Sequence, residues 1–269
     1  MTTATPEAPA TLAPPATPSP PAAAPPAPAK LAPQREWAPR IWEGSDFFGW
    51  IKLLARNRFA VSWQHLYIAL IVTFVSFGHS ALRLLEALLY GRRIRRTSIR
   101  QAPIFIIGHW RTGTTLLHEL LILDPRHTYP NTYQCLEPNH FLLTEGFITR
   151  HLHFLMPSRR PMDNMAAGWD RPQEEEFALC MMGVPSPYLT IAFPNHPPQC
   201  QEYLDLEGLS PKELGDWKRS FLRLLQKLNF KDPRRLVLKS PPHSCRIKTL
   251  LELFPDRSEE RRVGKECRL

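Results

Sequence analysis

Apolar and polar positions along this chain predict a sheet flanked by helices. The run Pro103–Ile107 is short, apolar and rich in β-branched residues, as buried strands are, and Arg235–Leu238 has the same character. After Ser210, which begins a serine–proline–glutamate helix start, apolar residues recur at helical spacing. A further short strand is expected at Tyr133–Leu136. The pattern therefore predicts an α/β fold with a mostly parallel sheet.

The segment 41–100 is predicted to be helical. An amphipathic helix is expected to begin at Phe47 and to end near Arg58. The strongly apolar run Trp63–Phe77 follows, and the residues from Gly78 to Ser80 are expected to interrupt it. The uninterrupted run is shorter than the ~20 residues that a membrane-spanning helix needs.

The basic residues behind this apolar segment leave three arrangements open. Four arginines follow Tyr90, as is typical of a segment that ends at a membrane surface: Arg92, Arg93, Arg95 and Arg96. The segment can pack on the domain or in a dimer contact, lie on a membrane through residues 41–96, or span the membrane.

Both ends of the chain differ in composition from the part between them. Residues 1–40 are rich in proline and alanine and have few large apolar side chains, so we expect a disordered tail. Residues 257–269 contain RSEERRVGKEC, which resembles one translated reading frame of a sequencing adapter. We expect a non-native tail there, behind an α/β domain at 101–256 whose sheet is incomplete at its C-terminal side.

Charge and cysteine content narrow the class of protein. The net charge of +9, from 34 basic and 25 acidic residues, suits an anionic nucleotide or a membrane surface. No basic run with interleaved aromatic residues is present, so nucleic-acid binding is not expected. The five cysteines lie far apart without C-x-x-C pairing, which indicates neither a zinc site nor a disulfide framework. Reduced thiols in a cytoplasmic protein are expected.

The first candidate site follows the first predicted strand. Gly108 to Thr115 is a loop with two glycines that leads into a predicted helix from Leu116. Free backbone N–H groups at a helix start, together with the helix dipole, bind phosphate-like anions. Gly108 and Gly113 have the spacing of a nucleoside-triphosphatase P-loop, but Thr114 stands where that loop has its lysine.

The cation of this loop lies inside it, at Arg111. A loop with an internal cation and no lysine–hydroxyl pair suits an anion that is handled without a metal ion. A P-loop-type nucleotide kinase and a membrane-associated nucleotide-binding protein are the alternatives that the loop leaves open.

The second candidate site lies at the end of the other predicted strand. Lys239 follows Arg235–Leu238 directly, and His243 comes four residues later. Ligands of parallel sheets bind outside the carboxyl ends of the strands, so Lys239 and Arg111 are expected to face one crevice. Two cations there would stabilise negative charge that develops on a leaving group.

A run of three glutamates opens another predicted helix. Glu174, Glu175 and Glu176 precede the apolar face Phe177–Met182, so part of the run must point toward the interior. A carboxylate in this position can accept a proton as a general base. Glu175 and Glu176 are the stronger candidates, although periodicity does not separate them.

Three segments together resemble the bacterial sulfotransferase family. Trp110–Thr115 (WRTGTT) closely resembles the signature [RK]-[ST]-G-T-[TS], and Pro172–Leu179 is similar to P-x-E-[DE]-E-F-A-L. Lys239–Pro241 resembles K-[DST]-[PH]. Cytosolic members have a histidine two residues after this lysine, where the present chain has Pro241, and His243 lies further on.

The resemblance implies in-line transfer of a sulfuryl group from 3′-phosphoadenosine 5′-phosphosulfate to an acceptor hydroxyl or amine, without a metal. It also implies which residues bind the 5′-phosphosulfate: Arg111, Thr112, Gly113, Thr114 and Thr115. Arg111 and Lys239 would stabilise the transition state, and Glu175, Glu176 or His243 would be the base.

The same resemblance leaves the acceptor open as a small molecule, a glycan or a peptide. In this family the 3′-phosphate site lies on and after a strand beyond Asp256. The chain is therefore expected to be an incomplete fragment of an enzyme, with impaired activity.

Overall fold

The computed structural model describes residue 42, residues 44–156, residue 159 and residues 165–255, all within the compact unit Ala32–Leu269. The predictions for 1–40 and 257–269 lie outside the described residues. The helices and strands have these bounds: α1 Phe47–Arg56, α2 Leu66–Arg96, β1 Ile104–Ile106, α3 Thr114–Leu121, β2 His127–Thr128, α4 Thr132–Leu136, α5 Phe141–His151, α6 Glu175–Met181, α7 Pro211–Lys231, β3 Arg235–Lys239 and α8 Ile247–Leu253. Short 3₁₀ helices are η1 Trp63–His65, η2 His153–Leu155, η3 Pro187–Ile191, η4 Gln201–Tyr203 and η5 Pro241–Ser244.

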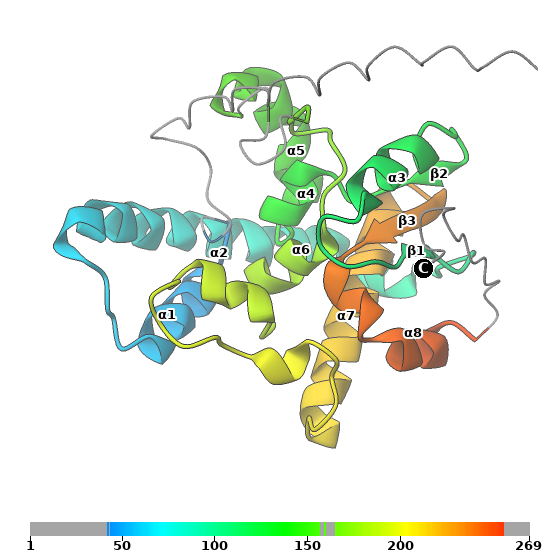
Figure 1. Cartoon of the computed structure of the whole chain (residues 1–269). Helices are drawn as coiled ribbons and strands as arrows, with labels where there is room; N and C mark the ends of the chain where they lie inside the picture. Colours follow the sequence, from blue (N-terminus) through cyan, green and yellow to red (C-terminus); the bar gives the residue numbers. More distant parts are fainter. Residues whose placement is uncertain (1–41, 43, 157–158, 160–164, 256–269) are drawn as a thin grey trace, which may run out of the picture. The chain divides into compact units, whose positions relative to one another are not determined.

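The described strands form one small parallel sheet in a mostly helical chain (Figure 1). Their order is β1-β3-β2, and both outer strands run parallel to β3. Ile106, the last residue of β1, lies in register with Lys239, the last residue of β3. The predicted α/β fold is therefore confirmed, and both strand ends that carry candidate site residues lie at one edge of the sheet.

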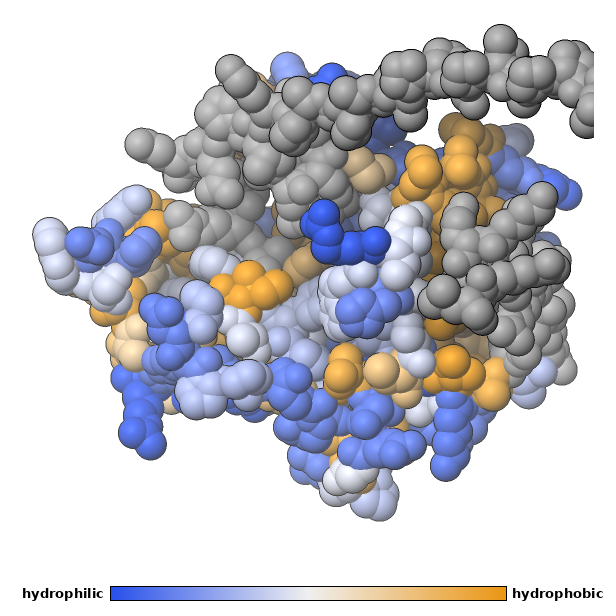
Figure 2. Space-filling model, viewed as in Figure 1, coloured by the Kyte–Doolittle hydropathy of each residue, from blue (hydrophilic) through white to orange (hydrophobic). Residues whose placement is uncertain are grey.

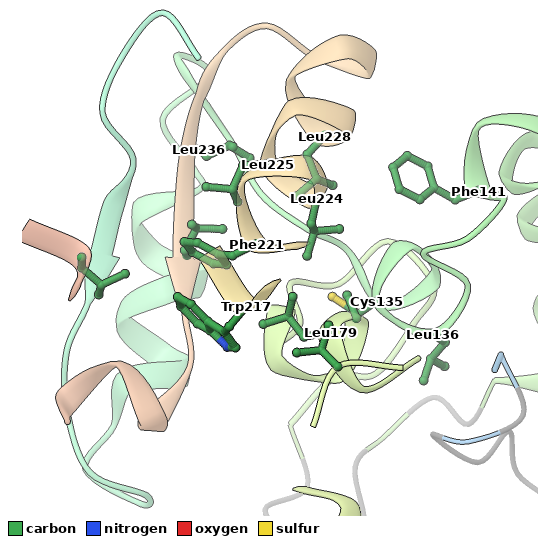
Figure 3. Packing of buried hydrophobic residues seen from close by; sticks show 14 of the residues in the cluster. Cys135, Leu136, Phe141, Leu179, Trp217, Phe221, Leu224, Leu225, Leu228 and Leu236 are labelled. Carbon is green, nitrogen blue, oxygen red and sulfur yellow. The ribbon is translucent and has the colours of Figure 1, made fainter. Parts of the chain in front are cut away.

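The main core lies between the sheet and α7. The predicted helix start at Ser210 is confirmed, because its side chain and that of Glu213 form a capping box. The apolar stripe of α7 packs against alternate residues of β3 and against α4 and α6 (Figure 3); its buried members include Trp217, Phe221, Leu224, Leu225 and Leu228. Side chains alternate between the faces of a strand, so Leu236 and Leu238 join this core together.

The other face of β3 is covered by α3. His118 of α3 is buried and hydrogen-bonds with the backbone of Val237, the residue between the two core leucines of β3. The outer side of α3 is apolar and exposed at Leu116 and Leu120, as is Leu123 just after the helix, and Figure 2 shows a hydrophobic surface over this helix. The helix thus places one polar side chain directly behind the strand that carries Lys239.

Two local predictions were wrong. Tyr133–Leu136 is not a strand but part of α4, because Asn131 and Gln134 form a capping box that starts a helix. The expected interruption from Gly78 to Ser80 is also absent: α2 is one continuous helix of 31 residues. One glycine weakens a helix by only about 1 kcal/mol relative to alanine, and the Ser80 hydroxyl donates to the carbonyl of Ser76 one turn earlier.

Candidate active site

The anion-binding loop joins β1 to α3. Arg111 and Gly113 both adopt the left-handed backbone conformation, with φ of 63° and 79°. Gly113 is the N-cap of α3, which begins at Thr114 rather than at the predicted Leu116. Thr114 and Thr115 therefore lie in the first helical turn, where backbone N–H groups have no partner within the helix. This is the geometry that a phosphate or sulfate group requires.

The loop is tied to the end of β3. The backbone N–H of Gly108 donates to Ser244 Oγ (3.1 Å), and the Thr112 hydroxyl donates to the carbonyl of His109 (2.6 Å). A Cβ atom at Gly108 would lie 2.6 Å from Thr114 Cγ2, so a larger residue there would force the Thr114 side chain to move. The loop and the segment after Lys239 thus form one structure at the sheet edge.

Lys239 is buried at the end of β3 and is held by an acidic residue. Its Nζ donates to Glu174 Oε1 (2.5 Å), and the Tyr188 phenol donates to Glu174 Oε2 (2.6 Å). Trp110 of the loop also hydrogen-bonds with Tyr188. Lys239 retains only 5% of its accessible surface. The structure thus brings the loop, the strand-end lysine and the first glutamate of the run together.

The other two glutamates pair with the segment that follows Lys239. Glu175 pairs with His243, and neither side chain is exposed to solvent. Arg246 donates to both carboxylate oxygens of Glu176, at 2.5 and 3.0 Å, and this pair is also fully buried. The Ser186 hydroxyl donates to Glu176 Oε1 (2.5 Å). Each glutamate therefore has its own partner.

Electrostatics separate the ionised groups of the site from the neutral ones. Burial lowers the pKa of His118 to about 4, although the negative charge of Glu175 acts in the opposite direction. This imidazole is therefore neutral at pH 7. Burial favours a higher pKa for Glu175, but the charge and hydrogen bond of His243 outweigh burial and lower it. Burial and the neighbouring Glu174 carboxylate raise the pKa of the Tyr188 phenol well above its usual range. Tyr188 is therefore a hydrogen-bond donor and not a base.

The predicted site residues fall into two groups. Arg111 is exposed on the loop, and the loop residues Thr112 to Thr115 surround the start of α3. Glu175, Glu176 and His243 are buried behind Lys239 and are held by charged partners. Sequence reasoning placed them in the site but did not separate their environments.

Three further residues of the site were not predicted. Tyr188 and Arg246 hold the carboxylates of Glu174 and Glu176, and His118 lies behind the strand. Arg246 follows Lys239 by seven residues, but this spacing alone does not indicate a buried cation.

A glycine loop at a helix start, beside a buried strand-end lysine on a parallel sheet, is the arrangement with which α/β proteins bind phosphate-like groups. Residues 103–258 match the model of the sulfotransferase family. The chain belongs to this family, which implies a sulfonate donor and favours the sulfotransferase interpretation over the kinase alternative.

Two curated relatives are omega-hydroxy-beta-dihydromenaquinone-9 sulfotransferases Stf3, from Mycobacterium bovis and Mycobacterium tuberculosis. Each is 53% identical over 227 residues, which cover 84% of this chain and 58% of the relative. The chain thus spans less than two thirds of the length of these relatives.

Two solved structures resemble the chain over part of its length. Sulfotransferase STF9 from Mycobacterium avium shares 21% identity with a TM-score of 0.43, over 65% of this chain and 45% of its own. Sulfotransferase STF1 from Mycobacterium tuberculosis shares 20% identity with a TM-score of 0.43, over 78% of this chain and 58% of its own.

Proposed function

We propose that this chain carries the donor-binding and proton-accepting part of a cytoplasmic sulfotransferase. It would transfer a sulfuryl group from 3′-phosphoadenosine 5′-phosphosulfate to the hydroxyl of an apolar small molecule. The observation that carries the proposal is the Lys239–Glu174 pair, 2.5 Å between Nζ and Oε1, at the sheet edge where the anion-binding loop begins.

The loop would hold the 5′-phosphosulfate. The free N–H groups at the start of α3 and the guanidinium of Arg111 would bind its oxygens, with Thr112 and Gly113 shaping the turn and Thr114 and Thr115 in the first helical turn. Lys239 would stabilise the negative charge on the bridging oxygen as its bond to sulfur breaks. No metal ion is required by this part of the proposal.

Glu174 is the base that the geometry favours. In the transfer step the acceptor oxygen bonds to sulfur, the bond from sulfur to the bridging phosphate oxygen breaks, and the acceptor proton passes to a carboxylate. The predicted candidates Glu175 and Glu176 are fully buried, and they are already paired with His243 and with the guanidinium of Arg246. Glu174 keeps some exposure and would become free to accept a proton once Lys239 turns to the donor. His243 would then hold Glu175 in place rather than act on the acceptor.

The acceptor would bind in an apolar pocket beside Tyr188. The pocket lies among α1, α6 and the segment that contains η3, and apolar side chains dominate its lining, including Leu53, Met181, Val184 and Leu189. The Tyr188 phenol lines this pocket and also bonds Glu174. The curated relatives are named for a menaquinone derivative with an ω-hydroxyl, and an acceptor of this quinone type would suit such a lining.

Donor binding can be tested on this chain without turnover, by calorimetry with 3′-phosphoadenosine 5′-phosphate. Lys239→Met should weaken binding, because a charge partner of the phosphate is lost. Glu174→Gln should instead strengthen binding several-fold, because the lysine is no longer held by a carboxylate. Equal weakening by both substitutions would contradict the proposed release of Lys239.

A second titration addresses the loop and the kinase alternative. Arg111→Ala should weaken binding of the bisphosphate by about tenfold or more, as expected for one charge-assisted contact. Arg126→Ala is the matched control, since Arg126 is an exposed arginine that pairs with Asp124 outside the loop. Tighter binding of ATP with Mg²⁺ than of the bisphosphate would refute the sulfotransferase assignment of this site.

The exposed face of α2 would hold the protein on a membrane surface. The stretch Trp63–Arg96 is the one helical segment among the described residues that is long and apolar enough, by length and composition, to cross a membrane. Its large apolar side chains are mostly exposed at helical spacing, including Tyr67, Leu70, Ile71, Phe74, Leu84, Leu85 and Leu88. The exposed arginines at its end would meet anionic lipid head groups. An interfacial position would give the pocket access to a lipid-soluble acceptor.

Sedimentation with vesicles tests this contact. The chain should sediment with vesicles of anionic lipid more than with zwitterionic ones, and Phe74→Glu should abolish sedimentation. Phe147→Glu is the control, because Phe147 is an exposed apolar residue on α5. A stable dimer that loses its contact with Phe74→Glu, without vesicle binding, would assign this face to self-association.

A further inference from the structure

A cluster of three metal-ligand side chains lies away from the proposed sulfuryl-transfer site. His79 comes from α2, Glu137 is the C-cap of α4, and His140 directly precedes α5. One ligand atom from each lies within 4.8 Å of the other two. Glu137 Oε2 is 3.1 Å from His140 Nε2 and 3.7 Å from His79 Nδ1. The carboxylate therefore lies between two imidazole nitrogens.

Hydrogen bonds to Thr144 determine which nitrogen of His140 carries its proton. The Thr144 hydroxyl has one hydrogen, which it donates to the carbonyl of His140 (3.1 Å), and it accepts from the Tyr133 phenol (2.8 Å). With the Thr144 hydrogen on this carbonyl, His140 Nδ1, 3.0 Å from the same oxygen, donates to that oxygen. His140 Nε2 is left with a lone pair, which faces the carboxylate of Glu137.

Two lone pairs that face each other in a buried place require a positive charge between them. His140 is only 2% exposed, and neither its Nε2 nor Glu137 Oε2 has a hydrogen-bond partner within the described part of the chain. Either a second proton on the imidazole or a metal ion can supply this charge. A proton would satisfy only the 3.1 Å contact, whereas a metal ion would also use the nitrogen of His79.

We propose that His79, Glu137 and His140 bind one divalent transition-metal ion, with Zn²⁺ as the best match. Two imidazoles and one carboxylate form a ligand set that Zn²⁺ accepts, with metal–ligand distances of about 2.0–2.2 Å. Ligand atoms at those distances in a tetrahedral site lie about 3.4 Å apart, close to the separations of 3.1 and 3.7 Å. Thr144 gives His140 the second hydrogen bond that orients metal-ligating histidines.

The ion would fasten α2 to the rest of the molecule. Only five of the 31 residues of α2 are buried: Val72, Ser76, Glu86, Gly91 and Ile94. A helix with so few buried side chains is held weakly by packing alone. A metal ion shared by His79 on α2 and two ligands at the turn between α4 and α5 would hold the middle of the helix in position.

Metal analysis of the untagged chain tests the proposal. After dialysis against Zn²⁺ and then against metal-free buffer, elemental analysis should find one zinc per chain. His79→Gln and Glu137→Gln should each lose that zinc, and His153→Gln, which replaces an exposed histidine on η2, should retain it. Zinc should also raise the melting temperature of the wild-type chain and of His153→Gln, but not that of the two ligand variants.

Spectra of the wild-type chain with Co²⁺ keep the test valid if a ligand variant fails to fold. Co²⁺ should give the visible bands of a four-coordinate nitrogen–oxygen site and no thiolate charge-transfer band. A thiolate band, or equal zinc content in all variants, would place the metal elsewhere and overturn the assignment. Absence of bound metal together with an unchanged melting temperature would assign the cluster to an imidazolium–carboxylate pair only.

Discussion

Removing the cation of the buried Glu176–Arg246 pair is predicted to destabilise the fold strongly. Arg246→Met would delete two hydrogen bonds, 2.5 and 3.0 Å long, to a carboxylate with no exposure to solvent. Breaking a buried ion pair from one side costs about 3–5 kcal/mol, because the remaining charge stays buried without compensation. Domains of this kind unfold with about 5–15 kcal/mol in total, so about a fifth or more of the stability would be lost.

Urea unfolding followed by circular dichroism measures this loss. With a slope of about 2 kcal/mol per molar urea, the transition midpoint should fall by about 2 M. Adding Glu176→Gln to Arg246→Met should recover most of the difference, because the buried carboxylate charge is removed while its hydrogen bond from Ser186 can persist.

The double variant also decides the role of Glu176. If Glu176 has only a structural role, the double variant should recover its stability and should bind 3′-phosphoadenosine 5′-phosphate as tightly as the wild-type chain does. Unfolding of Arg246→Met at the wild-type midpoint would contradict the predicted loss of stability, and so would a double variant that is no more stable than the single one.

Three further predictions concern the loop, α3 and α2. Gly113→Ala should cost about 1–2 kcal/mol and weaken donor binding, because φ is 79° at this position; urea unfolding and calorimetry measure both. His118 has a pKa of about 4 in the folded chain, against an ordinary value of 6.5. Between pH 6.5 and pH 4 the unfolded chain therefore binds more protons than the folded chain does. The free energy of unfolding falls as the pH drops through this range. The free energy of unfolding should fall by about 2 kcal/mol from pH 7 to pH 5, and His118→Gln should remove this slope. Lys227→Met would leave Glu86 of α2 without its buried cation. Hydrogen exchange in this variant should then be faster at the amides of α2 than at those of α7. Equal exchange rates in the two helices would contradict a role of this pair in holding α2.

Local signals in the sequence were sufficient for the elements that carry the anion-binding loop. These signals are the β-branched run before Gly108, the glycine spacing and the capping residues at Ser210. Each of them depends only on residues that are close in the sequence. The strand and both helices are present, although α3 begins at Thr114 rather than at Leu116. The parallel arrangement of the two strands was predicted, whereas their register comes from the structure. This register places Lys239 beside the end of β1.

The roles within the glutamate run depend on contacts that local sequence does not contain. Glu174, Glu175 and Glu176 are adjacent in the sequence, and their partners lie 65, 68 and 70 residues away. Periodicity assigns a face of a helix to each position, but it does not say which cation the fold brings to that face. The choice of Glu174 as the proposed base therefore needed the structure.

The errors in α2 and α4 have a similar origin. The composition of Tyr133–Leu136 suits a strand, but the capping box at Asn131 starts a helix there. The helix α2 continues through Gly78 because side chains along it bond to their own helix and to its neighbours, as Ser80 does when it accepts from the backbone N–H of Phe47. In both places side-chain hydrogen bonds outweighed a weak local propensity: a local capping box in α4, and local and tertiary bonds of Ser80 in α2.

The pairing of three adjacent glutamates with Lys239, His243 and Arg246 also restricts how the chain can fold. A shift of one residue between α6 and the segment after β3 would bury three mismatched charged groups at once, and each mismatch would cost several kcal/mol. Packings that lie close to the native one are therefore strongly disfavoured, and the two segments must order together. It follows that the position of Lys239 is fixed by the same pairings that fix α6 in the core.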